Sequence, residues 1–184
     1  MNSALIVNRD QSQLVLVDMQ TKLSSVMPES LAEVVKHCAI LLQAANLLEI
    51  STIVTEQYPK GLGNTWPALA AHLNGKKAVD KTAFSCCGEP TFNRQLLRDH
   101  GHIVLAGMEA HICILQTALD LLEQGKTVFV VEDAIISRNP ANKLNAINRL
   151  REAGAVISNT ESVVFEWLGV AEGDAFKKIS QLIR

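Results

Sequence analysis

The stretch His102-Ile-Val-Leu-Ala-Gly107-Met-Glu-Ala-His-Ile-Cys113-Ile-Leu-Gln-Thr-Ala118 decides the fold class of this chain. Its first five residues indicate a short buried strand, and the residues after Cys113 place apolar side chains on one helical face. Ligands bind at such strand-to-helix junctions in open parallel sheets. Backbone N–H groups and the helix dipole at the junction predict a thiolate at Cys113. The alternative is a buried structural cysteine.

Strands and helices alternate in both directions from this stretch. The sequence pattern predicts strands over 14–18, 51–55, 78–80, 102–106, 126–131 and 155–158. It predicts helices over 31–49, 66–73, 90–98, the segment after Cys113, 140–153, and 161–184 with a break near 169–173. Apolar strands that alternate with helices predict an α/β fold, a three-layer α/β/α sandwich around a mainly parallel six-stranded, Rossmann-like sheet. The predicted strand order is 3-2-1-4-5-6, which makes strands one and four neighbours.

Length and composition exclude several classes of protein. The 184 residues suit a single domain over 1–184, and hydrophobic residues make up 48% of the chain. A net charge of −2 offers no basic surface, so we expect no nucleic-acid partner and no membrane partner. The four cysteines follow no disulfide spacing and there is no signal-peptide pattern, which together predict a cytoplasmic protein.

Three polar residues stand where predicted strands end: Asp18, Lys81 and Cys113. The carboxyl ends of parallel strands meet at one sheet edge, so we expect these side chains to converge there. A thiol needs a base or a nearby cation to act as a nucleophile, and Asp18 and Lys81 would supply them. Taken singly, Asp18 could instead be a helix cap or a loop-ordering group, and Lys81 could be an ordinary solvated lysine.

Three segments together resemble one known family. They are Leu16-Val-Asp18-Met-Gln20, Asp80-Lys81-Thr-Ala-Phe-Ser85 and Gly107-Met-Glu-Ala-His-Ile-Cys113. In this order they resemble the isochorismatase-like cysteine hydrolases, and most of all the small isochorismatase-domain-containing proteins, over about Gln11 to Glu166. The resemblance implies an isochorismatase-like fold, an Asp-Lys-Cys triad, a homo-oligomer and a small-molecule substrate of unknown identity.

The resemblance also implies roles for individual residues. Cys113 would attack a carbonyl carbon, Asp18 would act as general base, and Lys81 would orient and stabilise the pair. The backbone N–H groups of Glu109 and Cys113 would form the oxyanion hole. A cis peptide bond would join Met108 and Glu109.

The loop after the second predicted strand departs from the nicotinamidases of this family. Those enzymes hold a metal there with histidines, whereas this chain has Glu56 and Tyr58 and no histidine. We therefore expect no catalytic metal and no other cofactor. The predicted function is a metal-independent amidohydrolase that cleaves a carboxamide or carbamoyl C–N bond through a thioester. The alternatives are an idle or regulatory binding protein and, more weakly, a redox sensor using Cys86 or Cys87.

Four further residues are candidates for the substrate pocket. Gln20 could point into the site or could instead bind backbone in its loop. Gln57 and Tyr58 belong to the long loop after the second predicted strand. Phe84 could form a wall of the pocket or pack in the core. For His111 we expect a structural or subunit-contact role.

Overall fold

Six parallel strands form one sheet in the computed structural model, which describes residues 5–28 and 30–183. The strands are β1 (Ser12–Val17), β2 (Ser51–Gln57), β3 (Val79–Lys81), β4 (His102–Met108), β5 (Thr127–Ile136) and β6 (Val156–Ser158). Their order is β3-β2-β1-β4-β5-β6, and every neighbouring pair is parallel. The predicted fold class and strand order are thereby confirmed.

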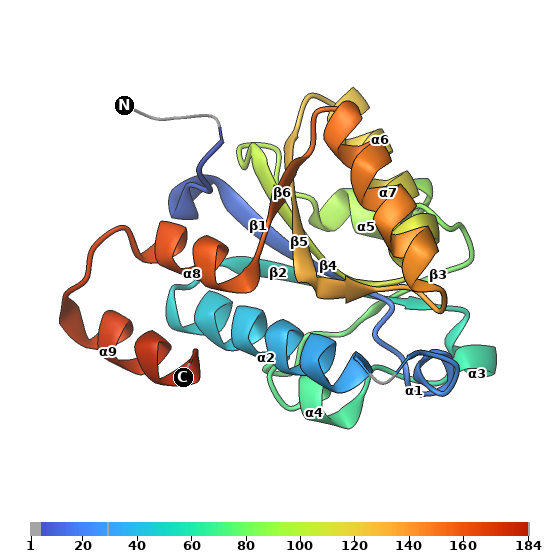
Figure 1. Ribbon diagram of the computed structural model, residues 1–184, viewed down its shortest axis with the longest axis horizontal. Helices are drawn as coiled ribbons and strands as arrows, with labels where there is room; N and C mark the ends of the chain where they lie inside the picture. Colours follow the sequence, from blue (N-terminus) through green and yellow to red (C-terminus); the bar gives the residue numbers. More distant parts are fainter. Residues whose placement is uncertain (1–4, 29, 184) are drawn as a thin grey trace.

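Helices cover both faces of this sheet (Figure 1). One layer holds α2 (Leu31–Leu47), α4 (Pro67–Ala70), α8 (Thr160–Leu168) and α9 (Gly173–Leu182), and the other holds α5 (Pro90–Gln95), α6 (Leu115–Glu123) and α7 (Pro140–Glu152). Two further short helices, α1 (Thr21–Ser24) and α3 (Pro59–Leu62), lie in loops. None of the helices in the described ranges is long and apolar enough to cross a lipid bilayer.

Alternate residues of the central strands feed two separate apolar cores. Leu14 and Leu16 of β1 pack with α2 and α8, whereas Val15 and Val17 pack with α6 and α7. Successive side chains of a strand point to opposite faces, so a strand between two helical layers must be apolar at every position. This is why the strands are continuous apolar runs in the sequence.

Several elements differ from their predicted bounds. β2 continues to Gln57 because it pairs with β3 up to Lys81, so Lys81 ends β3 instead of following it. The loop after β2, predicted to be irregular, contains α3, whose four residues are too few for a helical period to register. β5 runs five residues beyond its predicted end because its last residues pair with β4 after a shift in register.

Gly107 allows β4 to approach β1 closely beneath the predicted site. Its φ is +122°, and a Cβ atom there would lie 2.0 Å from the carbonyl oxygen of Val17. No side chain fits this position, because both the backbone conformation and the space require glycine. The segment that carries Cys113 therefore starts from a close contact between the two central strands.

Candidate active site

The carboxyl ends of β1, β3 and β4 bring Asp18, Lys81 and Cys113 together. Asp18 follows β1 with a left-handed backbone, and its side chain is buried. Its Oδ1 accepts a hydrogen bond from Thr55 Oγ1 at 2.7 Å, and its Oδ2 lies 2.8 Å from Lys81 Nζ. Lys81 Nζ in turn lies 3.5 Å from Cys113 Sγ. The ammonium group thus touches both the carboxylate and the thiol.

The Lys81 ammonium is buried and surrounded by oxygen acceptors. Besides Asp18 it contacts Gln57 Oε1 at 2.5 Å and the carbonyl oxygens of Ala83 and Phe84, each at 3.1 Å. Burial by itself would lower the pKa of Lys81, but the charges and hydrogen bonds of its partners outweigh burial, and the pKa is raised. Lys81 is therefore a permanent cation at neutral pH.

The thiol of Cys113 is protonated at rest, contrary to the expectation from its place at a helix start. Burial and the nearby Asp18 carboxylate raise its pKa to about 12, although Lys81 opposes this shift. The residue is only 7% exposed, so desolvation of a thiolate outweighs the helix dipole. The prediction of a preformed thiolate was wrong for this physical reason.

Asp18 is a stronger base than an ordinary aspartate. Burial raises its pKa, while Lys81, Thr55 and Cys113 lower it by charge and hydrogen bonding, and burial prevails. A carboxylate with a raised pKa beside a protonated thiol can accept the thiol proton as the sulfur attacks. The arrangement therefore suits concerted general-base catalysis rather than a resting thiolate.

Cys113 lies in a short π-helical segment, Ala110–Ile114, that continues into α6. The peptide bond between Met108 and Glu109 is cis. The carbonyl of Glu109 accepts hydrogen bonds from the N–H groups of Ile112 at 3.1 Å and Ile114 at 3.2 Å. These bonds form the turn that leads from β4 to the thiol.

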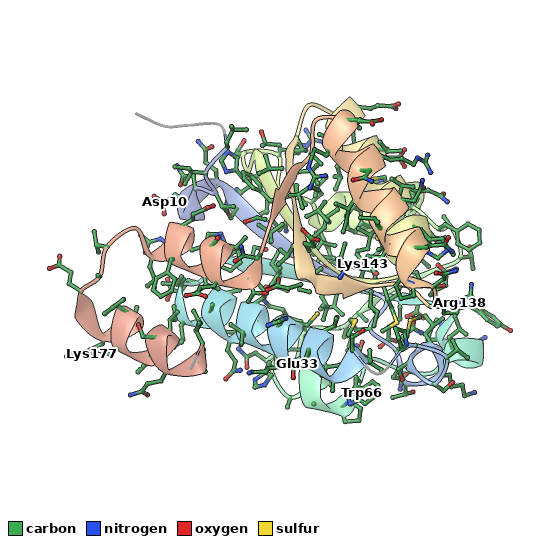
Figure 2. The ribbon with its side chains drawn as sticks, in the orientation of Figure 1. Asp10, Glu33, Trp66, Arg138, Lys143 and Lys177 are labelled. Atoms are coloured by element: carbon green, nitrogen blue, oxygen red, sulfur yellow. The ribbon has the colours of Figure 1, made fainter. Side chains whose placement is uncertain are left out.

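The carboxylate of Glu109 binds a residue that the sequence analysis missed. Arg138, just beyond β5 and beside the start of α7 (Figure 2), donates from Nε to Oε1 at 3.0 Å and to Oε2 at 3.1 Å. The backbone N–H of Arg138 also donates to Glu109 Oε2, at 2.9 Å. The predicted strand ended at residue 131, seven positions before Arg138, so the sequence pattern gave no signal for this residue or for its partner.

Of the four predicted pocket residues, Gln20 has a different role. Its side chain is buried and binds backbone only: Nε2 donates to the carbonyls of Gln57 at 3.0 Å and Gly63 at 2.6 Å, and Oε1 accepts from the N–H of Gln57 at 2.8 Å. Both polar atoms of the amide are thus engaged by backbone groups at the end of β2 and in the loop after it. The alternative reading of Gln20, a residue that orders its loop, is the one the hydrogen bonds support.

The other three lie around Lys81. Gln57 bridges the ammonium and the carbonyl of Thr82, which its Nε2 reaches at 2.9 Å. Tyr58 and Phe84 are 56% and 55% exposed, so Phe84 is not a core residue. A hollow of about 300 Å³ is lined by one residue of the triad, Lys81, together with Tyr58, Pro59, Lys60, Asp80, Thr82 and Glu89.

His111 and Cys86 lie close to the triad without joining it. His111 Nδ1 is 2.9 Å from Ser137 Oγ, so the imidazole ties its segment to the loop after β5. Cys86 is buried, and its Sγ lies 3.9 Å from Thr55 Oγ1, one hydrogen bond away from Asp18. All four cysteines are free thiols.

Glu56 of β2, a potential metal ligand, makes structural hydrogen bonds. Glu56 is buried, and its Oε1 accepts from the N–H of Thr65 at 2.6 Å and from Thr65 Oγ1 at 2.7 Å. Across 5–28 and 30–183 there is no group of three His, Cys, Asp or Glu side chains placed to hold a metal ion.

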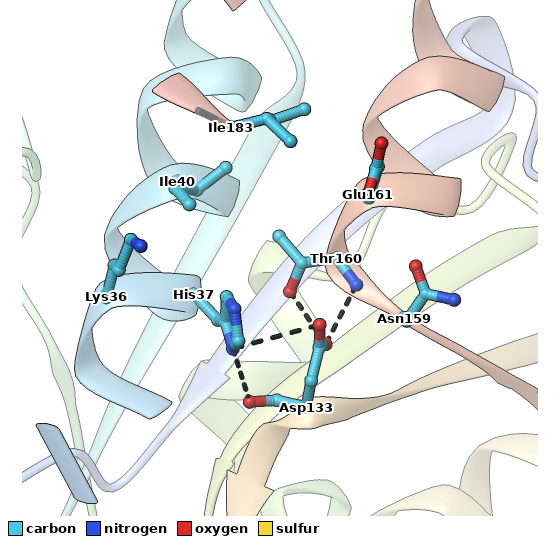
Figure 3. Close-up of a pocket in the computed structure, with 8 residues that line it drawn as sticks. All are labelled: Lys36, His37, Ile40, Asp133, Asn159, Thr160, Glu161 and Ile183. Atoms are coloured by element: carbon cyan, nitrogen blue, oxygen red, sulfur yellow. Dashed lines mark hydrogen bonds and ion pairs between the residues drawn. The ribbon is translucent and has the colours of Figure 1, made fainter. Parts of the chain in front are cut away.

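A second polar hollow lies between α2, β5 and the start of α8 (Figure 3). Asp133 Oδ1 accepts from the N–H and the Oγ1 of Thr160, both at 2.8 Å, while His37 Nδ1 contacts the carbonyl of Asp133 at 2.9 Å. Asp133 of β5 therefore binds the start of α8 through its carboxylate and binds α2 through its backbone carbonyl. Its contacts are structural and separate from the triad.

Comparison with known proteins gives consistent matches. A family model described as Isochorismatase domain matches residues 12–162. Isochorismatase domain-containing protein 2 of Bos taurus is 41% identical over 178 residues, which cover 94% of this chain and 83% of that protein. A Caenorhabditis elegans structure titled as MAR1 ribonuclease is 38% identical, with a TM-score of 0.91, and covers 97% of this chain and 92% of its own. The YcaC gene product of Escherichia coli, titled an octameric hydrolase of unknown specificity, is 20% identical with a TM-score of 0.89 over 99% of this chain and 92% of its own, and shows the fold alone.

Proposed function

The chain belongs to the isochorismatase-like hydrolase family, and from this premise we propose that it is a metal-independent cysteine hydrolase. It would cleave a C–N bond of a small carboxamide or carbamoyl compound through a thioester on Cys113. The observation that carries the proposal is the chain of contacts from Asp18 Oδ2 to Lys81 Nζ at 2.8 Å and on to Cys113 Sγ at 3.5 Å. A nucleophile, a base and a cation meet there in one buried cluster.

In the first step Cys113 Sγ attacks the carbonyl carbon while its proton passes to Asp18. The S–C bond forms as the C=O double bond becomes a C–O⁻ single bond, giving a tetrahedral intermediate. The N–H groups of Glu109 and Cys113 would hold this oxyanion. One such donor is typically worth about 10²–10³ in rate. Lys81 remains charged throughout and stabilises the Asp18 carboxylate before it takes the proton.

In the second step the intermediate collapses. The C–N bond breaks and the leaving nitrogen takes the proton from Asp18, so that ammonia or an amine departs and a thioester remains. Water then attacks the thioester carbon and gives a proton to Asp18, so that a C–O bond forms. The C–S bond breaks, the sulfur takes the proton back from Asp18, and the carboxylic or carbamic acid leaves. The raised pKa of Asp18 supports both roles, because the group must accept a proton and then release it to nitrogen.

The surroundings of the triad support a small substrate. Tyr58 and Phe84 are exposed near Lys81 and would provide apolar contacts, and Gln57 would hold Lys81 in place. We further propose that the protein is a single domain, that it is cytoplasmic and that it forms a homo-oligomer. The octameric Escherichia coli neighbour supports only its oligomeric part.

Two other functions are weaker candidates. An idle or regulatory binding protein would keep the fold, but it would have no need of a buried carboxylate, cation and thiol in contact. The second candidate is ribonuclease activity, because the similar Caenorhabditis elegans protein is named a ribonuclease. The net charge of −2 gives little attraction for RNA phosphates, which counts against it here.

The proposal is tested by measuring ammonia release from a panel of small primary amides and N-carbamoyl compounds. Cys113→Ala should keep the melting temperature of the parent and abolish turnover, and Asp18→Asn should reduce it strongly. Turnover by Cys113→Ala at the parent rate would remove the mechanism. If the whole panel is inert while a labelled single-stranded RNA is cleaved by the parent and not by Cys113→Ala, the ribonuclease assignment replaces it.

A further inference from the structure

Glu109 is held at both of its acceptor groups. Its carbonyl oxygen accepts from Ile112 and Ile114, and its carboxylate accepts from the Nε and the backbone N–H of Arg138. The carboxylate side chain is only 6% exposed, whereas that of Arg138 is 55% exposed. Arg138 is therefore the cation that allows a carboxylate to be buried beside the turn that carries Cys113.

With its carbonyl and carboxylate both bound, Glu109 has little freedom to rotate about its backbone. The backbone nitrogen of Glu109 is bonded to the same Cα as its carbonyl and its side chain. The hydrogen bonds that hold those two groups therefore also limit the direction of the Glu109 N–H. A second contact, between His111 Nδ1 and Ser137 Oγ at 2.9 Å, ties the turn to the loop that carries Arg138. The loop after β5 thus supports the turn at two points.

We propose that Arg138 is a positioning residue that aims the Glu109 N–H at the oxyanion formed when Cys113 attacks a carbonyl. This inference rests on the proposed function, since it requires the oxyanion. Loss of Arg138 would leave the buried Glu109 carboxylate without its cation, so the turn that carries Cys113 would lose a contact that holds it in place. Misplacing a catalytic group by about 1 Å can cost on the order of 10²-fold in rate.

The inference can be tested without knowing the substrate. Propionaldehyde adds reversibly to a cysteine thiol: an S–C bond forms, the carbonyl oxygen becomes an alkoxide, and the thiol proton ends on that oxygen. The affinity is measured as protection of Cys113 against iodoacetamide, followed by peptide mass spectrometry. Iodoacetamide alkylation displaces iodide and builds no charge on a carbonyl oxygen, so its rate reports the thiol and not the oxyanion hole.

Arg138→Ala should weaken propionaldehyde protection about tenfold to a hundredfold while the iodoacetamide rate changes less than about twofold. Arg138→Lys should restore part of the affinity, because it keeps the charge. Arg151→Ala is the matched control, since Arg151 is an exposed arginine of α7 whose side chain donates to Asn148 Oδ1 of the same helix. Glu109→Gln, which keeps the side-chain shape without the charge, serves as the second variant should Arg138→Ala fail to fold.

The outcomes separate this inference from the proposed function. Absence of propionaldehyde protection in the parent protein would contradict the cysteine-hydrolase proposal and the inference with it. Protection in the parent that is equal in Arg138→Ala and Glu109→Gln would overturn only the positioning role. A parallel fall in protection and in alkylation rate would assign Arg138 a purely structural role and would also overturn it.

Discussion

Replacing Lys81 with methionine should destabilise the protein far more than an ordinary lysine substitution. The Lys81 and Asp18 side chains are 0% and 1% exposed and 2.8 Å apart, so the variant would leave a buried carboxylate without its cation. Breaking such a pair from one side costs about 3–5 kcal/mol. For a chain of this size the melting temperature should fall by about 6–20 °C, at roughly 2–4 °C per kcal/mol.

The penalty should depend on pH in a defined direction. The folded-state pKa of Asp18 is already raised by burial, and loss of Lys81 would raise it further. A group with a raised folded pKa contributes stability that is present at low pH and lost as the pH rises through that pKa. The difference between Lys81→Met and the parent should therefore be smaller at pH 5 than at pH 7.5.

The assay is urea unfolding followed by circular dichroism at both pH values, with Lys60→Met as control because Lys60 is exposed in the neighbouring loop. The double variant Asp18→Asn with Lys81→Met removes both charges and should recover at least half of the loss. A loss below about 1 kcal/mol for Lys81→Met would refute the reasoning, since a buried pair of this geometry should cost more. An unchanged penalty at pH 5, or no recovery in the double variant, would do the same.

Two further predictions concern alkaline pH and the contact beneath the site. Burial raises the pKa of both Cys86 and Cys113 to about 12, so the unfolded chain loses these protons first as the pH rises above 9. Stability should then fall by about 1.4 kcal/mol per pH unit for each thiol, and Cys86→Ala should flatten the decline in urea midpoints between pH 9 and 10.5. Gly107→Ala should abolish folding or cost more than about 4 kcal/mol, because its Cβ would overlap the Val17 carbonyl. Gly125 also has a positive φ, but a Cβ atom there would meet no atom within 4 Å, so Gly125→Ala should cost only about 1–2 kcal/mol in urea unfolding. Equal losses for the two variants would contradict the steric account.

Much of the fold follows from the sequence because its signals are local. Strands buried on both faces must be apolar at every position, and the helices between them follow a helical period, so the alternation is visible in the residues. Polar residues placed just where such strands end mark Asp18, Lys81 and Cys113. The match to the isochorismatase domain confirms the family that these segments indicated.

The sequence by itself therefore determined the α/β class, the family and the three residues that meet at one sheet edge. Only the tertiary structure decided that the Cys113 thiol is protonated, that Gln20 orders a loop, and that Arg138 binds Glu109. These properties depend on burial and on partners at least 29 positions away along the chain. Strand and helix patterns arise between near neighbours, whereas desolvation and ion pairing arise only once distant segments have packed together.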